Sequence, residues 1–325
     1  MRIAIRLFIF ILLCASTFAV ETPARAQSWP THPARVVVPW APGGATDILA
    51  RLLANKFSQE FGQPFVVDNR PGGSGNVGAL MVARSEPDGY TLLVTNPGAF
   101  ATNQYLYKQM QYKPSDFAGV MLIAEFPNAL MVYKDLPVKS TAELVDYAKK
   151  NPTILNGGSS GVGTMGHLAL EMFKSMTGTQ IQNVFYKGAS LSKLDLATGR
   201  IHVVIDNIPG YLSELNSGSV RMIAVGTKTR APSFPNVPTL DESGLKGYQS
   251  SVWYALAVPK GVPVNIVRRL NATAATALRS PEFQERLKQL YGSAMGGSPE
   301  DADRFFAEES KRWKAIIEAA GVTPE

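Results

Sequence analysis

The sequence predicts an α/β protein made of two α/β domains. Three observations support this prediction: the chain has 325 residues, 45% of them are hydrophobic and 18% are charged, and short apolar runs alternate with glycine-rich turns and helical patterns. The composition is that of a folded globular chain without a disorder signature. The length suits two domains better than one, and strands that alternate with helices are typical of a parallel sheet.

The N-terminal 26 residues predict a secretory signal peptide. Two arginines precede an apolar run at residues 7–15, and an A-x-A cleavage pattern ends at Ala26. The only cysteine of the chain, Cys14, lies in this segment and follows Leu13, which is too large for a lipoprotein signal. We therefore expect cleavage after Ala26 and a mature chain in the periplasm that has neither disulfides nor lipid.

The charge of the mature chain argues against several classes of partner. Loss of residues 1–26 removes three arginines and one glutamate and lowers the formal charge from +6 by two, and no long basic run remains. We therefore expect no nucleic-acid partner. No later segment approaches the roughly 18 apolar residues of a membrane span, so we expect a soluble product, for which cytosolic cofactors such as NAD are improbable.

The first α/β region begins after the signal peptide. A β-branched run at residues 35–38 predicts a strand, and a glycine-rich turn follows it. Apolar residues then recur at helical spacing up to Phe61 and stop at Gly62. The pattern continues with a strand that starts at residues 65–67, a loop at 71–75 and a third strand at 90–95.

The second α/β region is predicted at residues 128–248, with a sheet of its own. An apolar helical stripe that ends at Gly178 is interpreted as core, not as a cofactor-binding pattern. The other expected elements are a helix at 140–150 and buried strands at 129–133, 154–156, 181–185, 203–205 and 222–225.

The chain is predicted to return to the first domain after residue 248. Residues 252–258 are typical of an apolar strand, and helical patterns follow it to the end. The last helix is expected to start at Ser298, which forms a capping box with Asp301. These helices have no sheet of their own, so we predict one domain from residues 27–127 plus 249–325 and a second from 128–248.

Two kinds of glycine motif resemble enzyme signatures. Residues 73–78 and 161–166 match G-x-G-x-x-G, but neither has the acidic residue about 20 positions later that a dinucleotide site needs. Residues 157–161 match the G-x-S-x-G nucleophile elbow, and Ser159, Asp195 and His202 follow the order of a hydrolase triad. His202 starts an apolar strand, a poor place for a general base, so a secreted α/β-type serine hydrolase using Ser159 is the alternative hypothesis. The histidines of the mature chain are isolated, and no metal site is expected.

The most informative feature is a pair of turns rich in glycine, serine and threonine, each at the start of a helix. One covers residues 42–47 and the other residues 159–164. Such turns present amide and hydroxyl donors to an anion, and the helix dipole adds to the attraction. Two of them on opposing domains predict a cleft for a small carboxylate with little need for buried Arg or Lys. The alternative is a purely structural role, in which these turns only connect strands to helices.

The same segments resemble the Bug family of periplasmic solute-binding receptors, which serve tripartite tricarboxylate transporters. The similarity covers nearly the whole mature chain and consists of several motifs in one order. These are residues 36–47 (VVVPWAPGGATD), 67–73 (VDNRPGG), 87–93 (PDGYTLL), 159–168 (SSGVGTMGHL), 186–188 (YKG), 206–207 (DN) and 237–239 (VPT).

The resemblance implies a type II periplasmic-binding fold, in which two α/β domains hold one small carboxylate in the cleft between them. It implies a receptor without enzyme activity or cofactor, expected to be a monomer, that delivers its ligand to integral membrane subunits. The residues that it implies for ligand binding are Trp40, Gly43, Gly44, Ala45, Thr46, Asp47 and Asn96 in the first domain, and Ser159, Ser160, Thr164, Ala189, Ser190 and Asp206 in the second.

Two residues leave alternatives open. His167 falls in the first turn of a predicted helix, where a role in bracing the turn is at least as reasonable as ligand contact. A second negative charge at Asp206 is unfavourable beside a bound anion. Asp206 therefore either orders a loop or selects ligands with an amine, a hydroxyl or a protonated ring nitrogen. We also expect the domains to rock about hinges near residues 125–128 and 246–250.

Overall fold

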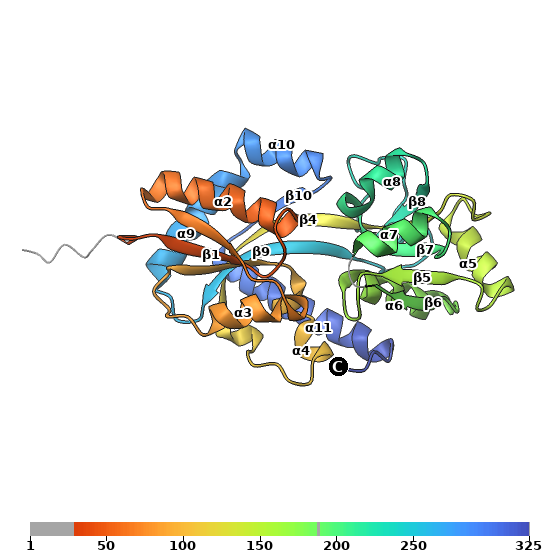
Figure 1. Ribbon diagram of the computed structural model, residues 1–325, viewed down its shortest axis with the longest axis horizontal. Helices are drawn as coiled ribbons and strands as arrows, with labels where there is room; N and C mark the ends of the chain where they lie inside the picture. The colour runs from red at the N-terminus through yellow and green to blue at the C-terminus, as the bar shows by residue number, and fades with distance from the viewer. Residues whose placement is uncertain (1–28, 187–188, 325) are drawn as a thin grey trace, which may run out of the picture. The chain divides into compact units, whose positions relative to one another are not determined.

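The computed structural model describes residues 29–186 and 189–324, with the side chains of residues 189 and 190 excepted. The predicted signal peptide and residues 187–188 therefore lie outside the described residues. His32–Glu325 form one compact unit, in which helices lie on both sides of a mixed β-sheet (Figure 1).

One half of the sheet is built around strand β1. Strand β1 (Ala34–Val38) pairs in parallel with β2 (Phe65–Asn69) and with β3 (Thr91–Thr95). Strand β3 then pairs antiparallel with β9 (Ser251–Pro259), and β9 pairs antiparallel with β4 (Phe117–Tyr133). The strand order across the whole sheet is β2-β1-β3-β9-β4-β7-β5-β6.

The other half of the sheet starts on the same strand β4. Residues 117–127 of β4 pair with β9 and, in part, with β10 (Ser293–Gly296), whereas residues 128–133 pair antiparallel with β7 (Val203–Asn207) and β8 (Val220–Val225). Parallel pairs join β7 to β5 (Asn156–Ser159) and β5 to β6 (Gln182–Phe185). We call the elements around β1, β2, β3, β9, β10 and residues 117–127 the first lobe, and those around β5 to β8 and residues 128–133 the second lobe.

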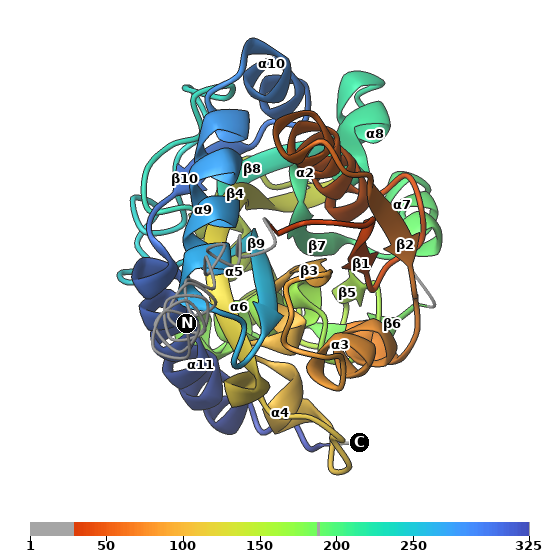
Figure 2. The same ribbon diagram turned by 90° about the vertical axis from the view of Figure 1, so that its left-hand side faces the viewer.

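Helices of the first lobe cover its sheet on both faces. Figure 2 shows α2 (Ala45–Phe61) on one side of β1, β3 and β9, and α3 (Asn76–Ala83) on the other. Helices α9 (Val264–Leu278) and α11 (Pro299–Ala319) pack against β4, and α9 also packs against α2. Shorter segments are α4 (Asn103–Leu106), α10 (Pro281–Gln289) and the 3-10 turns η2 (Gly73–Gly75), η3 (Pro97–Ala99) and η4 (Pro114–Asp116).

The second lobe has its own helices. Helix α6 (Met165–Thr177) packs against β5 and β7, and it ends at Gly178, whose φ of 66° needs the left-handed conformation that glycine adopts without strain. The remaining helical segments are α5 (Thr141–Lys150), which Ser140 caps, α7 (Ala189–Ala197), η5 (Ile208–Tyr211) and α8 (Leu212–Asn216).

Aromatic side chains fill the core of the first lobe beneath α11. The rings of Phe100 and Phe306 stack with centroids 4.3 Å apart, and Trp253 of β9 lies 5.6 Å from Phe306. Trp253 is only 1% exposed. Ile316, farther along α11, packs against buried side chains of both lobes. Helix α11 is therefore attached to the first lobe by its aromatic face and reaches the second lobe with its last turns.

A buried carboxylate fixes α11 to β9. Glu309 accepts hydrogen bonds from the indole nitrogens of Trp253 at 2.9 Å and Trp313 at 3.0 Å. Arg312 donates to both oxygens of Glu309, and its third nitrogen donates to the carbonyl of Gln249 at 2.7 Å. The charge of Glu309 is thus paired and its oxygens are satisfied, which a carboxylate needs when water is excluded.

Several sequence-based expectations about this sheet were wrong in part. The sheet is mixed, because β9 runs antiparallel to β3 and β4 is antiparallel to its partners. Strand β4 starts at Phe117, twelve residues before the expected strand, and it gives the second lobe a strand shared with the first. Strand β10 interrupts the expected run of helices, and β6 is an edge strand with Phe185 46% exposed, not a buried one.

Replacement of Glu309 by Ala is expected to lower the free energy of unfolding by about 3–5 kcal/mol, because Arg312 and two indole N–H groups lose their buried acceptor. Urea unfolding followed by circular dichroism measures the change. Glu308 is the matched control, since it is the next residue of α11 and is exposed, and its replacement by Ala should change stability by less than about 0.5 kcal/mol. Equal effects of the two replacements would contradict this assignment.

Candidate functional site

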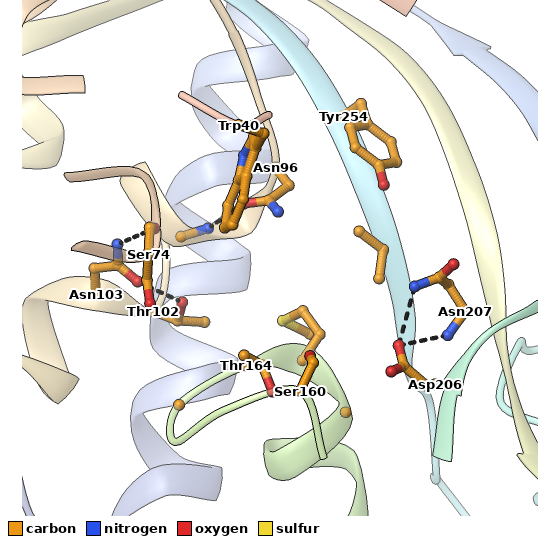
Figure 3. A pocket seen from close by; sticks show the side chains of 15 residues that line it. Trp40, Ser74, Asn96, Thr102, Asn103, Ser160, Thr164, Asp206, Asn207 and Tyr254 are labelled. Carbon is orange, nitrogen blue, oxygen red and sulfur yellow. Dashed lines mark hydrogen bonds between the residues drawn. The ribbon is translucent and has the colours of Figure 1, made fainter. Parts of the chain in front are cut away.

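A polar cavity of about 150 Å³ lies between the two lobes (Figure 3). Both lobes contribute to its wall, at the place where β4 changes partner from β9 to β7. First-lobe residues that line it are Trp40, Ser74, Asn96, Gly98, Thr102, Asn103, Val252 and Tyr254. Second-lobe residues that line it are Ser160, Gly163, Thr164, Met165, Gly166, Asp206 and Asn207.

The turn after β1 is held in place by Asp47. Its carboxylate accepts from the amide of Gly43 at 3.0 Å, from two nitrogens of Arg51 at 2.9 Å, and from Nδ2 of Asn69 at 3.0 Å. Burial alone would raise the pKa of Asp47, but these hydrogen bonds, led by those from Arg51, hold it below its usual value. Asp47 is 3% exposed, so its role in the structure is to shape the turn that carries Trp40.

A second first-lobe turn brings Ser74 to the cavity. Ser74 has a φ of 51°, which is uncommon for a residue with a side chain. Its carbonyl accepts from Nδ2 of Asn103 at 3.1 Å, and its hydroxyl oxygen accepts from the hydroxyl of Tyr107 at 2.7 Å. Because Tyr107 supplies the proton of that bond, the proton of Ser74 remains available as a donor.

Asn96 lies at the end of β3 and caps the turn η3. Its Oδ1 accepts from the amide of Gly98 at 3.2 Å. That bond fixes the side-chain amide with its oxygen toward the turn, and Nδ2 is not used by it. Asn96 therefore adds an amide donor to the first-lobe wall of the cavity.

The second-lobe turn before α6 is braced from within. The hydroxyl of Thr164 donates to the carbonyl of Gly161 at 2.8 Å and accepts from the amide of His167 at 3.4 Å, which makes Thr164 the N-cap of the helix. The Nδ1 atom of His167 accepts from the amide of Gly163 at 3.0 Å. Burial lowers the pKa of His167, so the neutral ring braces this turn, which is the structural alternative for that residue.

The three residues of the hydrolase alternative have separate partners. The hydroxyl of Ser159, which is 2% exposed, donates to the carbonyl of Gly161 at 3.3 Å. Asp195 accepts from the hydroxyl of Tyr186 and from Arg200, and Nδ1 of His202 accepts from the amide of Asn156 at 3.0 Å. Among the described residues no hydrogen bond joins Ser159, Asp195 and His202 to one another, so a charge-relay arrangement is not formed.

Asp206 is the acidic residue of the cavity wall, at the carboxyl end of β7. One oxygen, Oδ1, accepts from the amide of Asn207 at 2.8 Å and from its Nδ2 at 3.0 Å (Figure 3). Burial raises the pKa of Asp206 to about 6, although the hydrogen bonds from Asn207 act in the opposite direction. The side chain thus orders the loop after β7 and also faces the cavity.

The predicted site residues divide into two groups. Trp40, Asn96, Ser160, Thr164 and Asp206 come together on the cavity wall. The others lie outside the lining residues: Gly43, Gly44, Ala45, Thr46 and Asp47 in the turn before α2 and its first residues, and Ser159 at the end of β5. Ala189 and Ser190 begin α7, with side chains outside the described part of the chain.

Sequence reasoning missed several lining residues, chiefly Ser74, Thr102, Asn103, Asn207 and Tyr254. Tyr254 belongs to an apolar strand, where an aromatic side chain is normally interpreted as part of the hydrophobic core. Asn207 belongs to a motif of the family resemblance, which was the one available signal. Ser74 lies inside the G-x-G-x-x-G pattern at residues 73–78, whose glycines shape the turn that presents it.

Residues 29–186 and 189–324 contain neither a metal-binding cluster nor a membrane-crossing helix. No group of three or more His, Cys, Asp or Glu side chains there is arranged to hold a metal ion. In the same part of the chain, no helix combines the length and the apolar character that a membrane crossing requires.

Comparison with known proteins identifies relatives over almost the whole chain. A family model described as tripartite tricarboxylate transporter family receptor matches residues 49–322. The structure is similar to that of Rpa4515 from R. palustris with adipate (43% identity, TM-score 0.83, 91% of this chain and 100% of that chain). It is also similar to the periplasmic binding protein BugD (32%, 0.79, 91% and 100%) and to MatC from Rhodopseudomonas palustris with bound malate (30%, 0.78, 89% and 100%).

Replacement of Asp206 by Asn is expected to stabilise the ligand-free protein at alkaline pH. The pKa of Asp206 in the folded state, about 6, lies above the usual aspartate value of 3.8. The stability that its protonated form contributes is therefore complete below about pH 4 and is lost as the pH rises through about 6. At about pH 8 the Asn variant should be more stable by about 1–3 kcal/mol, and at about pH 4 by much less.

Urea unfolding at the two pH values measures this difference. Replacement of Asp146 by Asn is the matched control, because Asp146 is exposed on α5, away from the cavity. A stability gain in the Asp206 variant that is the same at both pH values would contradict the assignment of this carboxyl as the titrating group.

Proposed function

The chain belongs to the receptor family of tripartite tricarboxylate transporters, as its motifs indicated, and has the two-domain periplasmic-binding fold of the Bug receptors. From this premise we propose that it captures a small carboxylate in the cavity between its lobes and delivers it to the integral membrane subunits of such a transporter. The domain boundaries predicted from the sequence, at residues 127/128 and 248/249, are part of this proposal.

The observation that carries the proposal is the chemistry of the cavity wall. Its polar groups are hydroxyls, side-chain amides, the indole of Trp40, the N-terminal turn of α6 and the carboxyl group of Asp206, and the lining residues include neither Lys nor Arg. Neutral donors and a helix N-terminus stabilise a carboxylate without a formal ion pair. A volume of about 150 Å³ suits a small organic acid, since cavities of that size hold molecules such as benzene.

The relatives support this class of ligand. Rpa4515 is described with adipate and MatC with bound malate, both of which are dicarboxylates of a few carbon atoms. We propose that the present cavity takes an acid of this size, with Ser74 and Asn96 donating from the first lobe and Ser160 and the α6 N-terminus from the second.

The location and assembly state form a further part of the proposal. The family consists of periplasmic receptors, and we propose cleavage after Ala26 with a monomeric mature protein. N-terminal sequencing of the secreted protein and light scattering test these two points.

We also propose that the protein is not a hydrolase. Ser159, Asp195 and His202 are each hydrogen bonded to other groups. The test is hydrolysis of p-nitrophenyl esters by the wild type and by the Ser159→Ala variant. A turnover that is present in the wild type and absent in the variant would overturn the receptor assignment in favour of the enzyme.

Binding is tested by thermal shift with a panel of mono- and dicarboxylates, followed by calorimetry. A ligand at 100 times its dissociation constant should stabilise the protein by about 2.7 kcal/mol. Ser160→Ala and Ser74→Ala should each weaken binding by about 1–3 kcal/mol, because each removes a donor to a charged acceptor. Ser175→Ala, exposed on α6, is the control and should leave binding unchanged. No stabilisation by any acid of the panel would contradict the proposed function.

Lobe closure is proposed to accompany binding. Both connections between the lobes meet at buried residues: Nδ2 of Asn128 donates to Oγ of Ser250 at 3.2 Å, and the amide of Gly226 donates to the carbonyl of Asn128 at 2.7 Å. Few residues therefore have to change conformation when the lobes rotate. Donors from both lobes reach the ligand together only in the closed form, so the ligand favours that form by its differential affinity.

Small-angle scattering tests the closure, with adipate or whichever panel acid stabilises the protein most. The radius of gyration is expected to decrease when the acid saturates the receptor. An unchanged radius at saturation would mean that the empty protein is already closed, and would contradict the proposed hinge motion.

A further inference from the structure

The cavity holds one acidic side chain and no cationic one among its lining residues. Asp206 is 6% exposed and lies on the second-lobe wall, on the same side as Asn207 and below Tyr254 in Figure 3. A site that receives a carboxylate but also contains a buried carboxyl group places two like charges close together. Like charges at short distance in a site with little water raise the free energy of the state in which both are ionised.

The two oxygens of Asp206 have different surroundings. Oδ1 accepts two hydrogen bonds from Asn207, and Asn207 is itself fixed because its Oδ1 accepts from the amide of Gly210 at 3.2 Å. None of the described residues hydrogen bonds to Oδ2. This oxygen is close to the first turn of α6, since a Cβ placed on Gly166 would lie 3.4 Å from it. Oδ2 is therefore the atom of Asp206 that a ligand can reach.

No described cation compensates an ionised Asp206. Its partner in the sheet is Ala129 of β4, which carries no charge. The titratable groups that interact with it from other elements are Tyr211 of η5 and Tyr254 of β9, whose pKa values are raised by burial and by Asp206 itself, so both are neutral. The ring nitrogens of His167 on α6 lie against the amide of Gly163 and the carboxylate of Glu171 instead.

The charged groups of the surrounding helices are paired elsewhere. Lys193 of α7 lies 3.7 Å from Glu214 of α8, Lys174 pairs with Glu171 on α6, and Arg200 pairs with Asp195. Burial without a cationic partner is the reason that the pKa of Asp206 rises to about 6. A group with this pKa gains a proton near neutral pH at small cost, and a nearby anion lowers that cost further.

We propose that the ligand is a dicarboxylate whose second carboxylate accepts a hydrogen bond from Oδ2 of protonated Asp206. Binding then takes up one proton from solvent, which is placed on Oδ2 and shared with the ligand oxygen, and no bond of the ligand changes. The inference rests on the proposed receptor function and adds the chemical class of the ligand's far end. Asp206 is in this view a specificity residue that supplies a donor where a fixed cation would otherwise be required.

A ligand with an ammonium group at its far end would require Asp206 to be ionised. It would pair with ionised Asp206, take up no proton and bind more weakly as Asp206 becomes protonated. The sign of the proton linkage therefore separates the two ligand classes.

Three acids of equal chain length provide the test: adipate, ε-aminocaproate and caproate. Calorimetry is carried out from about pH 6 to pH 8.5, in phosphate and in Tris. Adipate is expected to bind most tightly, with close to one proton taken up above the pKa of Asp206, seen as a more endothermic signal in Tris. Its affinity should fall up to about tenfold for each pH unit above that pKa.

Asp206→Asn keeps the side-chain shape and a donor but cannot titrate. The proton uptake and the pH dependence of adipate affinity are expected to disappear in this variant, whereas both persist in Asp146→Asn. Circular dichroism confirms that each variant is folded. Because Asn retains a donor, adipate should still bind the Asn variant at about pH 8 with a dissociation constant within about tenfold of the wild type.

Three outcomes would overturn the inference: adipate binding without proton uptake, unchanged pH dependence in Asp206→Asn, or tighter binding of ε-aminocaproate than of adipate with loss of that binding in the variant. If the three acids fail to bind while malate stabilises the protein, the same calorimetry is carried out with malate, and malate binding without proton uptake would also overturn the inference. Absence of binding by every acid of the wider panel would instead contradict the proposed function itself.

Discussion

The rest of the structure depends on the hydrogen-bond ladder of strand β4. Its 17 residues pair with β9 up to Pro127, which faces Ser251, and with β7 from Asn128 onward, which faces Asn207. The backbone therefore passes from one lobe to the other without leaving a strand. The ends of β9 and β7 that face the cavity are held by this one partner, so Tyr254 and Asp206 lie across from each other although they are far apart in sequence. The shared strand thus holds β9 and β7 in register beside the cavity, while the two walls of the cavity belong to different lobes.

The cavity wall offers neutral hydrogen-bond donors in place of cationic side chains. Its turns present neutral donors, and the titratable residues beside them shape those turns. Asp47 is paired with Arg51 in the turn after β1. His167 is neutral and accepts a hydrogen bond from the turn before α6. Fixed cations would bind anions of many shapes, because Coulomb attraction has little directional preference. Directed hydrogen bonds from Ser74 and Asn96, whose own positions are fixed by Tyr107 and Gly98, favour one arrangement of acceptor oxygens.

The sequence predicted those parts of the fold that local signals determine. The helix that ends at Gly62 and the one that ends at Gly178 have left-handed glycine caps, and both glycine-rich turns precede helices as expected. Residues 117–128 gave no such signal, because this segment lacks an alternation of apolar and polar residues and contains Glu125 and Pro127. The G-x-S-x-G pattern at residues 157–161 suggested a turn, but Gly158 lies inside β5. A Cβ there would come within 2.3 Å of Ile201, so tight packing requires this glycine. Lining residues such as Asn103 and Tyr254 are brought to the cavity by tertiary structure, which periodicity does not encode.

The distribution of tryptophans has a spectroscopic consequence. Within His32–Glu325, Trp253 and Trp313 are buried and both donate to Glu309, so their surroundings are the same in any state that keeps α11 on β9. Trp40 alone of these three lines the cavity, and its indole nitrogen is buried without a hydrogen-bond partner among the described residues. Occupation of the cavity changes the polarity around the indole of Trp40, whereas Trp253 and Trp313 keep their surroundings. The protein thus contains its own fluorescent reporter, in which a shift of ultraviolet emission reads the filling of the cavity without any attached dye.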